Sequence, residues 1–300
     1  MFNFKSDIQF INYFRLFNFV SLILILISVG FIFYKGLNFG VDFKGGTLIE
    51  LRVENTEIGI GDVRQSFIKM NLGDVNVKKF GKGNDYLIKF EQTDKNKENF
   101  IENIKTQLSK NLTGNFSFRR VENVGPKVSG ELLKSGLIAI VLSLSAMLIY
   151  IWIRFEWQFS LGAIIALIHD VIITIGFFSI LEFEINLSIV AAVLTIVGYS
   201  MNDTVVIFDR VRENLKKYSS KSINEISNLS INETLSRTII TSSTTLLALL
   251  SIFFFGGKIL HGFSFAMILG VIFGTYSSIF IANPILIKLK VNQKSVLKEE

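Results

Sequence analysis

Six long apolar segments limit what this 300-residue chain can fold into more than any other feature. They cover residues 17–34, 135–153, 159–181, 185–208, 238–255 and 263–287. Each is long enough to cross a bilayer as a helix. Half of the residues are hydrophobic and the mean hydropathy is +0.47, which excludes an ordinary soluble domain. The sequence therefore predicts an α-helical polytopic membrane protein with six transmembrane helices.

Lysine and arginine collect at one end of these spans, which indicates their orientation. The basic flanks hold Lys5, Arg15, Arg154, Arg210, Arg212, Lys216, Lys217, Lys221, Lys288, Lys290, Lys294 and Lys298. The opposite short loops are acidic or sparsely charged. Because cytoplasmic loops carry the excess of Lys and Arg, we expect residues 1–16, the loop 209–237 and the tail 288–300 in the cytoplasm. No small-residue cleavage site follows the first span, so we expect it to remain as an anchor.

Residues 36–134 form one polar insertion between the first two spans, expected on the extracytoplasmic side. Alternating apolar residues predict strands at 47–53, 74–80, 85–91 and 115–124, and helical spacing predicts helices at 61–72 and 96–112. The resulting βαββαβ order is that of an α+β ferredoxin-like sandwich. We find no catalytic constellation in the insertion, and its pattern is that of a binding or moving module.

The scarcity of metal-binding side chains limits the chemistry further. Cysteine is absent, which excludes disulfides, thiol catalysis and zinc-thiolate sites, and two dispersed histidines do not favour a metal centre. We therefore expect no metal and no cofactor. The net charge of +6 is first an orientation signal in a membrane protein, and no nucleic-acid motif accompanies it.

The stretch 197–210 places polar side chains inside the fourth span. It reads VGYSMNDTVVIFDR, with Asn202 and Asp203 among apolar residues and with Asp209 and Arg210 at the cytoplasmic end of the helix. A carboxylate at this depth costs about 2.5 to 3.5 kcal/mol, so a retained one faces a partner or water. Asp203 is the main candidate for proton translocation. The alternative is a structural role in which it joins helices by hydrogen bonds.

The fifth span supplies a candidate partner for this carboxylate. Arg237, Thr241, Thr244 and Thr245 recur at helical spacing and form a cationic and hydroxyl-lined stripe. Movement of Arg237 relative to Asp203 would change how tightly the carboxylate holds a proton. Alternatively, Arg237 is a topological anchor at the lipid headgroups.

Two other spans carry a notable pattern. His169 and Asp170 lie near the middle of the third span, either as a second proton site or as a structural pair bonded to a neighbouring helix. No cation in the chain is an obvious partner at that depth.

In the sixth span Gly262, Ala266, Gly270, Gly274 and Ser278 recur every four residues and predict a face for close helix packing. Pro284 follows and predicts a kink.

Several motifs together carry a family resemblance. In chain order they are GVDFKGGT (40–47, with Asp42, Gly45 and Gly46), VGPKVSGEL (124–132, with Gly125 and Pro126), GYSMNDTVVIFDRVREN (198–214, with Gly198), RTIITSSTTLL (237–247) and GTYSSIFIANP (274–284). The chain resembles the SecF subunits of the SecD/SecF family. The Asn-Asp-Thr block is the most specific piece, since SecD differs there and has a longer extracytoplasmic domain.

The resemblance implies a fold, partners and a function. SecF-like proteins have a half of the resistance-nodulation-division (RND) architecture, pair with SecD to complete twelve helices, and associate with SecYEG in the bacterial inner membrane. The complex is thought to use the proton gradient to help draw translocating precursor polypeptides outward, and it is not an enzyme. The residues matching Asp203 and Arg237 are implicated in proton passage, together with an aspartate of SecD.

Two other classes of protein remain as alternatives. A proton-driven RND exporter of small molecules or lipids would share the architecture, but such exporters usually carry both halves in one chain. An intramembrane aspartyl protease would use Asp170 and Asp203 as a shared-proton pair. The glycines that such proteases place before the second aspartate are absent here, where Ser200, Met201 and Asn202 stand.

Overall fold

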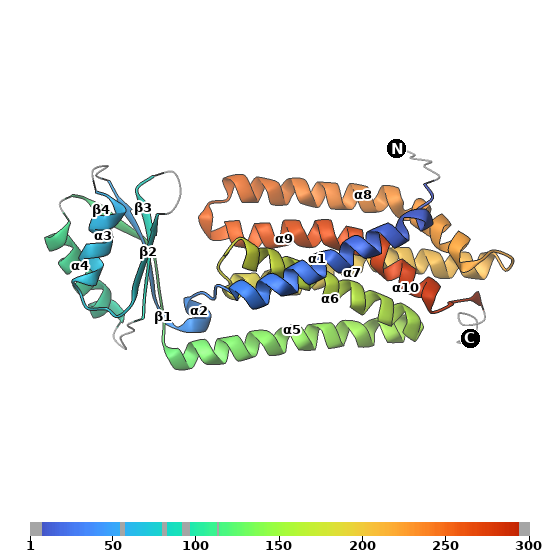
Figure 1. The fold of residues 1–300 in the computed structure, drawn as a ribbon, viewed down its shortest axis with the longest axis horizontal. Helices are drawn as coiled ribbons and strands as arrows, with labels where there is room; N and C mark the ends of the chain where they lie inside the picture. Colours follow the sequence, from blue (N-terminus) through green and yellow to red (C-terminus); the bar gives the residue numbers. More distant parts are fainter. Residues whose placement is uncertain (1–7, 55–57, 80–82, 92–96, 113, 294–300) are drawn as a thin grey trace. The chain divides into compact units, whose positions relative to one another are not determined.

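The computed structural model describes residues 8–54, 58–79, 83–91, 97–112 and 114–293. The chain divides into two compact units (Figure 1). The membrane unit comprises Met1–Asn38 and Leu137–Glu300, and the sheet unit comprises Phe39–Gly136.

Six helices of the described chain are long and apolar enough to cross a membrane, as the sequence predicts. The first five are α1 (Ile11–Lys35), α5 (Pro126–Arg154), α6 (Trp157–Ile180), α7 (Leu187–Lys217) and α8 (Ile223–Phe255). The sixth begins as α9 (Lys258–Ser277), continues through the π-helix η1 (Ser278–Ala282) and ends as α10 (Asn283–Lys288). Pro284 lies in the first turn of α10, so the irregularity in this span is the π-helix that precedes the proline.

The segment 209–237, expected as a loop, is almost entirely helical. Helix α7 continues to Lys217 and α8 begins at Ile223, which leaves only a short turn. Ser222 caps α8: its Oγ accepts from the Glu225 amide (3.3 Å), and the Glu225 carboxylate accepts from the Ser222 amide (2.8 Å). Hydropathy marks only the apolar part of each helix, so it cannot detect these amphipathic extensions.

Helices α6 and α7 and the sixth span form the core of the membrane unit. At least half of the apolar window of each is buried, against 17% or less for α1, α5 and α8. Stacked and edge-on contacts among Phe155, Phe159 and Phe208 fill the region where α5, α6 and α7 meet. The outer helices therefore present apolar side chains outward, as a lipid-facing layer does.

The small residues of the sixth span face α7. A Cβ atom on Gly274 would lie 2.9 Å from the Ser200 Cβ, and one on Gly270 would collide with Ile196. Ala266 and Ser278 are fully buried, and at Gly262 the nearest atom is the flexible end of Ile189, at 3.3 Å. Glycine thus permits the close approach of α9 to α7.

The sheet unit has the βαββαβ order that the sequence predicts. Its elements are β1 (Gly46–Val53), α3 (Ile60–Ile68), β2 (Val75–Lys79), β3 (Asp85–Phe90), α4 (Lys97–Asn111) and β4 (Phe116–Val124). The strands pair antiparallel in the order β2-β3-β1-β4. Alternate residues of β1 and β3 pack with Phe67 of α3 and Leu108 of α4.

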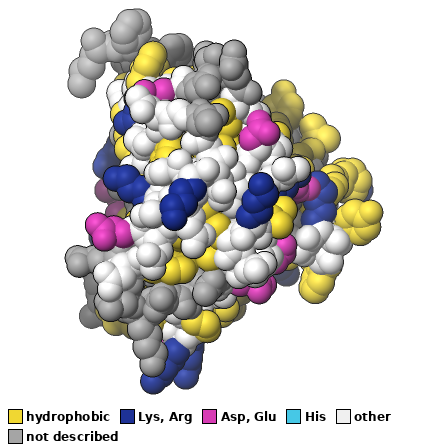
Figure 2. Space-filling model, turned by 90° about the vertical axis from the view of Figure 1, so that its left-hand side faces the viewer, with side chains coloured by type: hydrophobic (Ala, Val, Ile, Leu, Met, Phe, Trp, Pro, Cys, Tyr) yellow, Lys and Arg dark blue, Asp and Glu magenta, His cyan; other side chains and the backbone are white. Residues whose placement is uncertain are grey.

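Figure 2 shows one face of the molecule, where charged side chains of both signs lie scattered rather than in a single-sign patch.

The two glycine motifs meet at one end of the sheet. Gly46 pairs with Val124 across β1 and β4, and a Cβ on Gly46 would lie 2.6 Å from the Phe90 carbonyl oxygen. Gly45 lies against the Pro126 backbone, where α5 begins, and both glycines have positive φ. Asp42 lies in the preceding short helix α2 (Val41–Lys44), which the sequence pattern does not predict. These motifs therefore fix the points where the chain enters and leaves the sheet.

Candidate functional site

Two carboxylates are buried between the helices of the membrane unit. Asp203 on α7 is 4% exposed, and Asp170 on α6 is fully buried. Each is held by hydroxyl groups from neighbouring helices. A buried carboxylate without such donors would be far more costly, so these contacts are what makes the two positions tenable.

Asp203 is held by one hydroxyl from α8 and one from α9. Its Oδ2 lies 3.2 Å from the Thr275 Oγ1 and 3.4 Å from the Ser242 Oγ. The two hydroxyls are themselves 2.7 Å apart, and either can be the donor. No hydrogen bond within the described chain reaches Oδ1 of Asp203. Because a hydroxyl both donates and accepts, this cluster can serve an ionised carboxylate or a protonated carboxyl.

Arg237 does not touch Asp203. Its side chain is exposed on α8, and no ion pair within the described ranges joins the two residues. The predicted threonine stripe is present, but Thr241 and Thr244 donate to carbonyls of their own helix, at 3.0 and 2.9 Å.

Further polar positions lie on the exposed surface of α7. Gly198 and Asn202 are exposed there, one turn apart. Tyr199 joins this surface to α8, because its hydroxyl donates to the Thr241 carbonyl at 3.4 Å. Further toward the C-terminal end of α7, Asp209 pairs with Arg154 (3.2 Å) and Arg210 pairs with Glu213 (2.9 Å).

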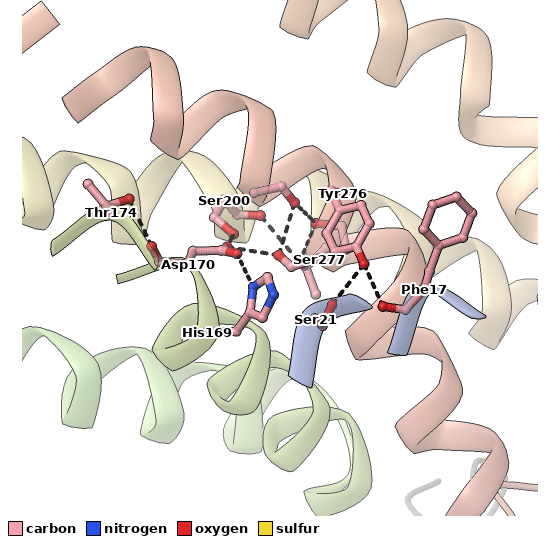
Figure 3. Close-up of polar contacts among 11 residues, drawn as sticks. Phe17, Ser21, His169, Asp170, Thr174, Ser200, Tyr276 and Ser277 are labelled. Atoms are coloured by element: carbon pink, nitrogen blue, oxygen red, sulfur yellow. Dashed lines mark hydrogen bonds and ion pairs between the residues drawn. The ribbon is translucent and has the colours of Figure 1, made fainter. Parts of the chain in front are cut away.

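Asp170 makes bonds to three side chains (Figure 3). Its Oδ1 lies 2.9 Å from Nδ1 of His169, and its Oδ2 accepts from Ser200 of α7 (2.7 Å) and Ser277 of α9 (2.8 Å). His169 is 2% exposed and stacks on the Tyr276 ring. Asp170 and Asp203 share no hydrogen bond in the described chain, and they bind different hydroxyls. This arrangement differs from the shared-proton pair that an aspartyl protease requires.

Sequence reasoning missed the four hydroxyl residues that hold the carboxylates, Ser200, Ser242, Thr275 and Ser277. Three of them lie in the stretches TSSTT and GTYSS, where hydroxyl residues cluster within an apolar helix. That clustering was the available signal. No group of three or more His, Asp or Glu side chains that could hold a metal ion occurs among the described residues.

The fold and these sites define a class of protein: a polytopic membrane protein with titratable groups buried between its helices. Comparison with known families gives the particular one. The family model "Protein export membrane protein SecD/SecF, C-terminal" matches residues 104–292, and the model "SecD/SecF GG Motif" matches residues 30–57. The chain therefore belongs to the SecD/SecF family of protein export membrane proteins, and within it to the SecF subunits of the protein translocase.

Individual relatives agree with this assignment. The chain is 49% identical over 283 residues to the protein translocase subunit SecF of Rickettsia bellii (strain OSU 85-389), which covers 94% of this chain and 93% of the relative. It is 48% identical over 285 residues to that of Rickettsia prowazekii (strain Madrid E), covering 94% and 91%. These matches do not favour the small-molecule or lipid exporter.

Two solved structures share the fold. The crystal structure of SecDF from Thermus thermophilus, a translocon-associated membrane protein, matches with a TM-score of 0.86 and 33% identity. A structure of SecDF in a super-membrane-facing form matches with a TM-score of 0.70 and 33% identity. Each match covers 97% of this chain and 40% of the SecDF chain, so this chain spans less than half of those proteins.

Proposed function

We propose that this SecF subunit couples the proton gradient to late steps in the translocation of exported polypeptides, together with a SecD chain and the SecYEG channel. The observation that carries the proposal is the environment of Asp203. The carboxylate lies between three helices, with two hydroxyls on one oxygen and no bond within the described chain to the other. A group held in this way can gain or lose a proton without losing its hydrogen-bond partners.

The hydroxyl pair explains how such a site avoids a large penalty in either state. With Asp203 ionised, Thr275 and Ser242 can both donate to Oδ2. With Asp203 protonated, the carboxyl donates to one hydroxyl, which donates in turn to the other across 2.7 Å. Each change reorders bonds between α7, α8 and α9, so proton binding and helix packing are linked.

The outer surface of α7 and α8 supports the need for a second chain. Gly198, Asn202, Arg237 and Thr244 are exposed on helices that cross the membrane. Arginine and asparagine facing lipid are costly, so this surface faces protein or water. We assign it to the SecD chain, which would place a SecD carboxylate near Arg237 and Asp203.

The orientation follows from the basic flanks. The protein lies in the bacterial inner membrane with both termini in the cytoplasm and residues 36–134 in the periplasm. There the sheet unit would meet the emerging polypeptide. The subunit acts as a transducer and not as an enzyme.

The energy that one proton delivers limits how much work the subunit can do in a single cycle. One proton crossing 100 mV delivers about 2.3 kcal/mol, which biases a conformational equilibrium but does not unfold a cargo in one step. Translocation therefore proceeds through repeated cycles of protonation and domain movement.

Two measurements test the proposal. The tagged chain is purified in mild detergent, and stable recovery of SecD and SecYEG is expected. Vesicles with and without the chain are then compared for release of a precursor protein, with the gradient present or collapsed by an uncoupler. The chain should increase release only when the gradient is present. Equal release in all four conditions, or export of a small molecule without SecYEG, would refute the proposal.

A further inference from the structure

The buried pair of His169 and Asp170 has no assigned role in the cycle above. We propose that it is a second proton-binding site of this chain, distinct from Asp203. The inference rests on the proposed function for its purpose, but proton binding at the pair can be measured without any export assay.

The first argument is the charge of the pair. No lysine or arginine in the described chain forms an ion pair with Asp170. The groups that contact the pair are Ser200 of α7 and Tyr276 and Ser277 of α9. Tyr276 in turn contacts Ser21 of α1. The carboxylate of Asp203, on α7, is bound to different hydroxyls. The pair is therefore electrically neutral only when it holds one proton in addition to the ring N–H of a neutral imidazole, either on His169 or on Asp170.

The second argument is that the surrounding bonds fit both protonation states. The Ser277 hydroxyl has two acceptors within reach, the Asp170 carboxylate at 2.8 Å and its own helix carbonyl at Gly274, at 3.2 Å. When Asp170 is ionised, Ser277 donates to it. When Asp170 is protonated, Ser277 can turn its hydrogen to Gly274 and accept from the carboxyl. The Asp170 carboxyl and the Ser277 hydroxyl thus keep hydrogen-bond partners in both states.

The third argument is an unused position on the histidine. Nδ1 of His169 is occupied by Asp170, whereas Nε2 is buried and has no hydrogen-bond partner among the described residues (Figure 3). A buried unpaired nitrogen is costly and calls for an explanation. The ring is held beside Tyr276, whose hydroxyl lies 2.6 Å from the Phe17 carbonyl and 2.8 Å from the Ser21 Oγ. Nε2 is therefore the ring atom of the pair that no protein group of the described chain engages.

The pair is connected to Asp203 through two shared helices. Ser200 and Asp203 are one turn apart on α7, and Thr275 and Ser277 are two residues apart on α9. The π-helix η1 begins at Ser278, directly after this segment of α9. The two sites are therefore distinct in their bonds but share neighbours on α7 and α9.

Infrared difference spectroscopy on the complex of this chain with SecD tests the inference directly. The band of interest is the carboxylic C=O stretch of a buried protonated carboxyl, followed over a pH series. In the Asp203→Asn complex the titrating band should contain a component from Asp170, and the Asp203→Asn/Asp170→Asn double variant should lose that component while any band of the SecD carboxyl remains in both. Thr174→Val is the matched control, because the Thr174 hydroxyl is buried beside the pair and its one hydrogen bond within the described chain goes to the Asp170 backbone carbonyl, at 2.8 Å. It should leave the band unchanged.

Other outcomes overturn the inference. Identical pH series for the single and double variants would mean that the pair does not titrate and is structural. If Asp170→Asn prevents assembly, Ser277→Ala in the Asp203→Asn background replaces it, and an unchanged titration midpoint would overturn the inference. Since these spectra record proton binding alone, a failure of gradient-driven export with an intact band would count against the proposed function and not against the site.

Discussion

Thr275 and Ser277 lie two residues apart on α9 and hydrogen-bond two different carboxylates. Thr275 reaches Asp203 on α7 at 3.2 Å, and Ser277 reaches Asp170 on α6 at 2.8 Å. The close packing of α9 on α7 places both hydroxyls where they can serve these groups. A short segment of α9 is therefore the common neighbour of both candidate proton sites.

Removal of the Thr275 hydroxyl should impair gradient-driven export without disrupting the fold. Thr275→Val keeps the shape but leaves Ser242 as the remaining donor to Asp203, at 3.4 Å. We expect the gradient-stimulated part of precursor release to fall about tenfold, which corresponds to about 1.4 kcal/mol, the scale of one hydrogen bond to a charged group. Thr275→Ser keeps the hydroxyl and should retain most activity. Normal export by the valine variant would show that the bond has no role.

The packing of α9 on α7 should be sensitive to a single added methyl group. Gly274→Ala places a Cβ 2.9 Å from the Ser200 Cβ and 3.2 Å from its Cα, so backbone must move. We expect a loss of about 1 to 3 kcal/mol, measured as a lower midpoint of thermal unfolding in detergent. Gly262→Ala on the same face meets only the flexible end of Ile189, and Gly198→Ala meets no atom within 4 Å. Equal midpoints for all three variants would contradict the close approach described here.

The glycine motif of the sheet unit should be equally restrictive. Gly46→Ala meets the Phe90 carbonyl oxygen at 2.6 Å and places alanine at φ +110°, so both sterics and backbone strain oppose it. We expect residues 39–136 to become sensitive to limited proteolysis in the full-length chain. Gly61→Ala, where the new Cβ has no neighbour within 4 Å, is the control. Unchanged resistance of the Gly46 variant would refute this account of the motif.

The sheet unit should lose stability at alkaline pH through Tyr86. The Tyr86 hydroxyl donates to the Ile58 carbonyl at 2.8 Å, and burial raises the pKa of Tyr86 above its ordinary value of 10.0. Because the folded unit binds this proton more tightly than the unfolded unit, the contribution is complete below about pH 10 and is lost as the pH rises through the raised pKa. Tyr86→Phe should cost about 1 kcal/mol at neutral pH and remove part of the alkaline loss. Proteolysis of residues 39–136 at pH 8 and pH 11 measures both effects, and an identical alkaline loss in the two proteins would contradict the assignment.

The architecture could be predicted from sequence because it follows from local patterns. Long apolar runs mark six spans, and alternation marks the strands of the sheet unit. The same patterns mark Asp203 and Asp170, since a carboxylate within an apolar run is conspicuous. The amphipathic extensions of α7 and α8 escaped prediction because hydropathy does not separate a helix from a polar loop beyond the membrane.

The partners of the two carboxylates could not be predicted, for a different reason. Thr275 is 72 positions from Asp203, and Ser277 is 107 positions from Asp170, so only the packing of distant helices brings them together. Serine and threonine are also common in membrane helices, where most bond their own backbone. Arg237 was selected for its charge, but the structure places it on an exposed face without contact to Asp203.

Gradient-stimulated precursor release by the Asp203→Asn variant is the most direct test of the central claim. Asparagine is nearly isosteric and can still bond Thr275 and Ser242, but it cannot gain and lose a proton. Vesicles that contain SecYEG, SecD and either wild-type or variant chain are compared with the gradient imposed or collapsed, after co-purification has shown equal assembly. We predict that the gradient stimulates release by the wild-type complex and has no effect on the variant. Undiminished stimulation in the variant would contradict a proton-carrying role for Asp203.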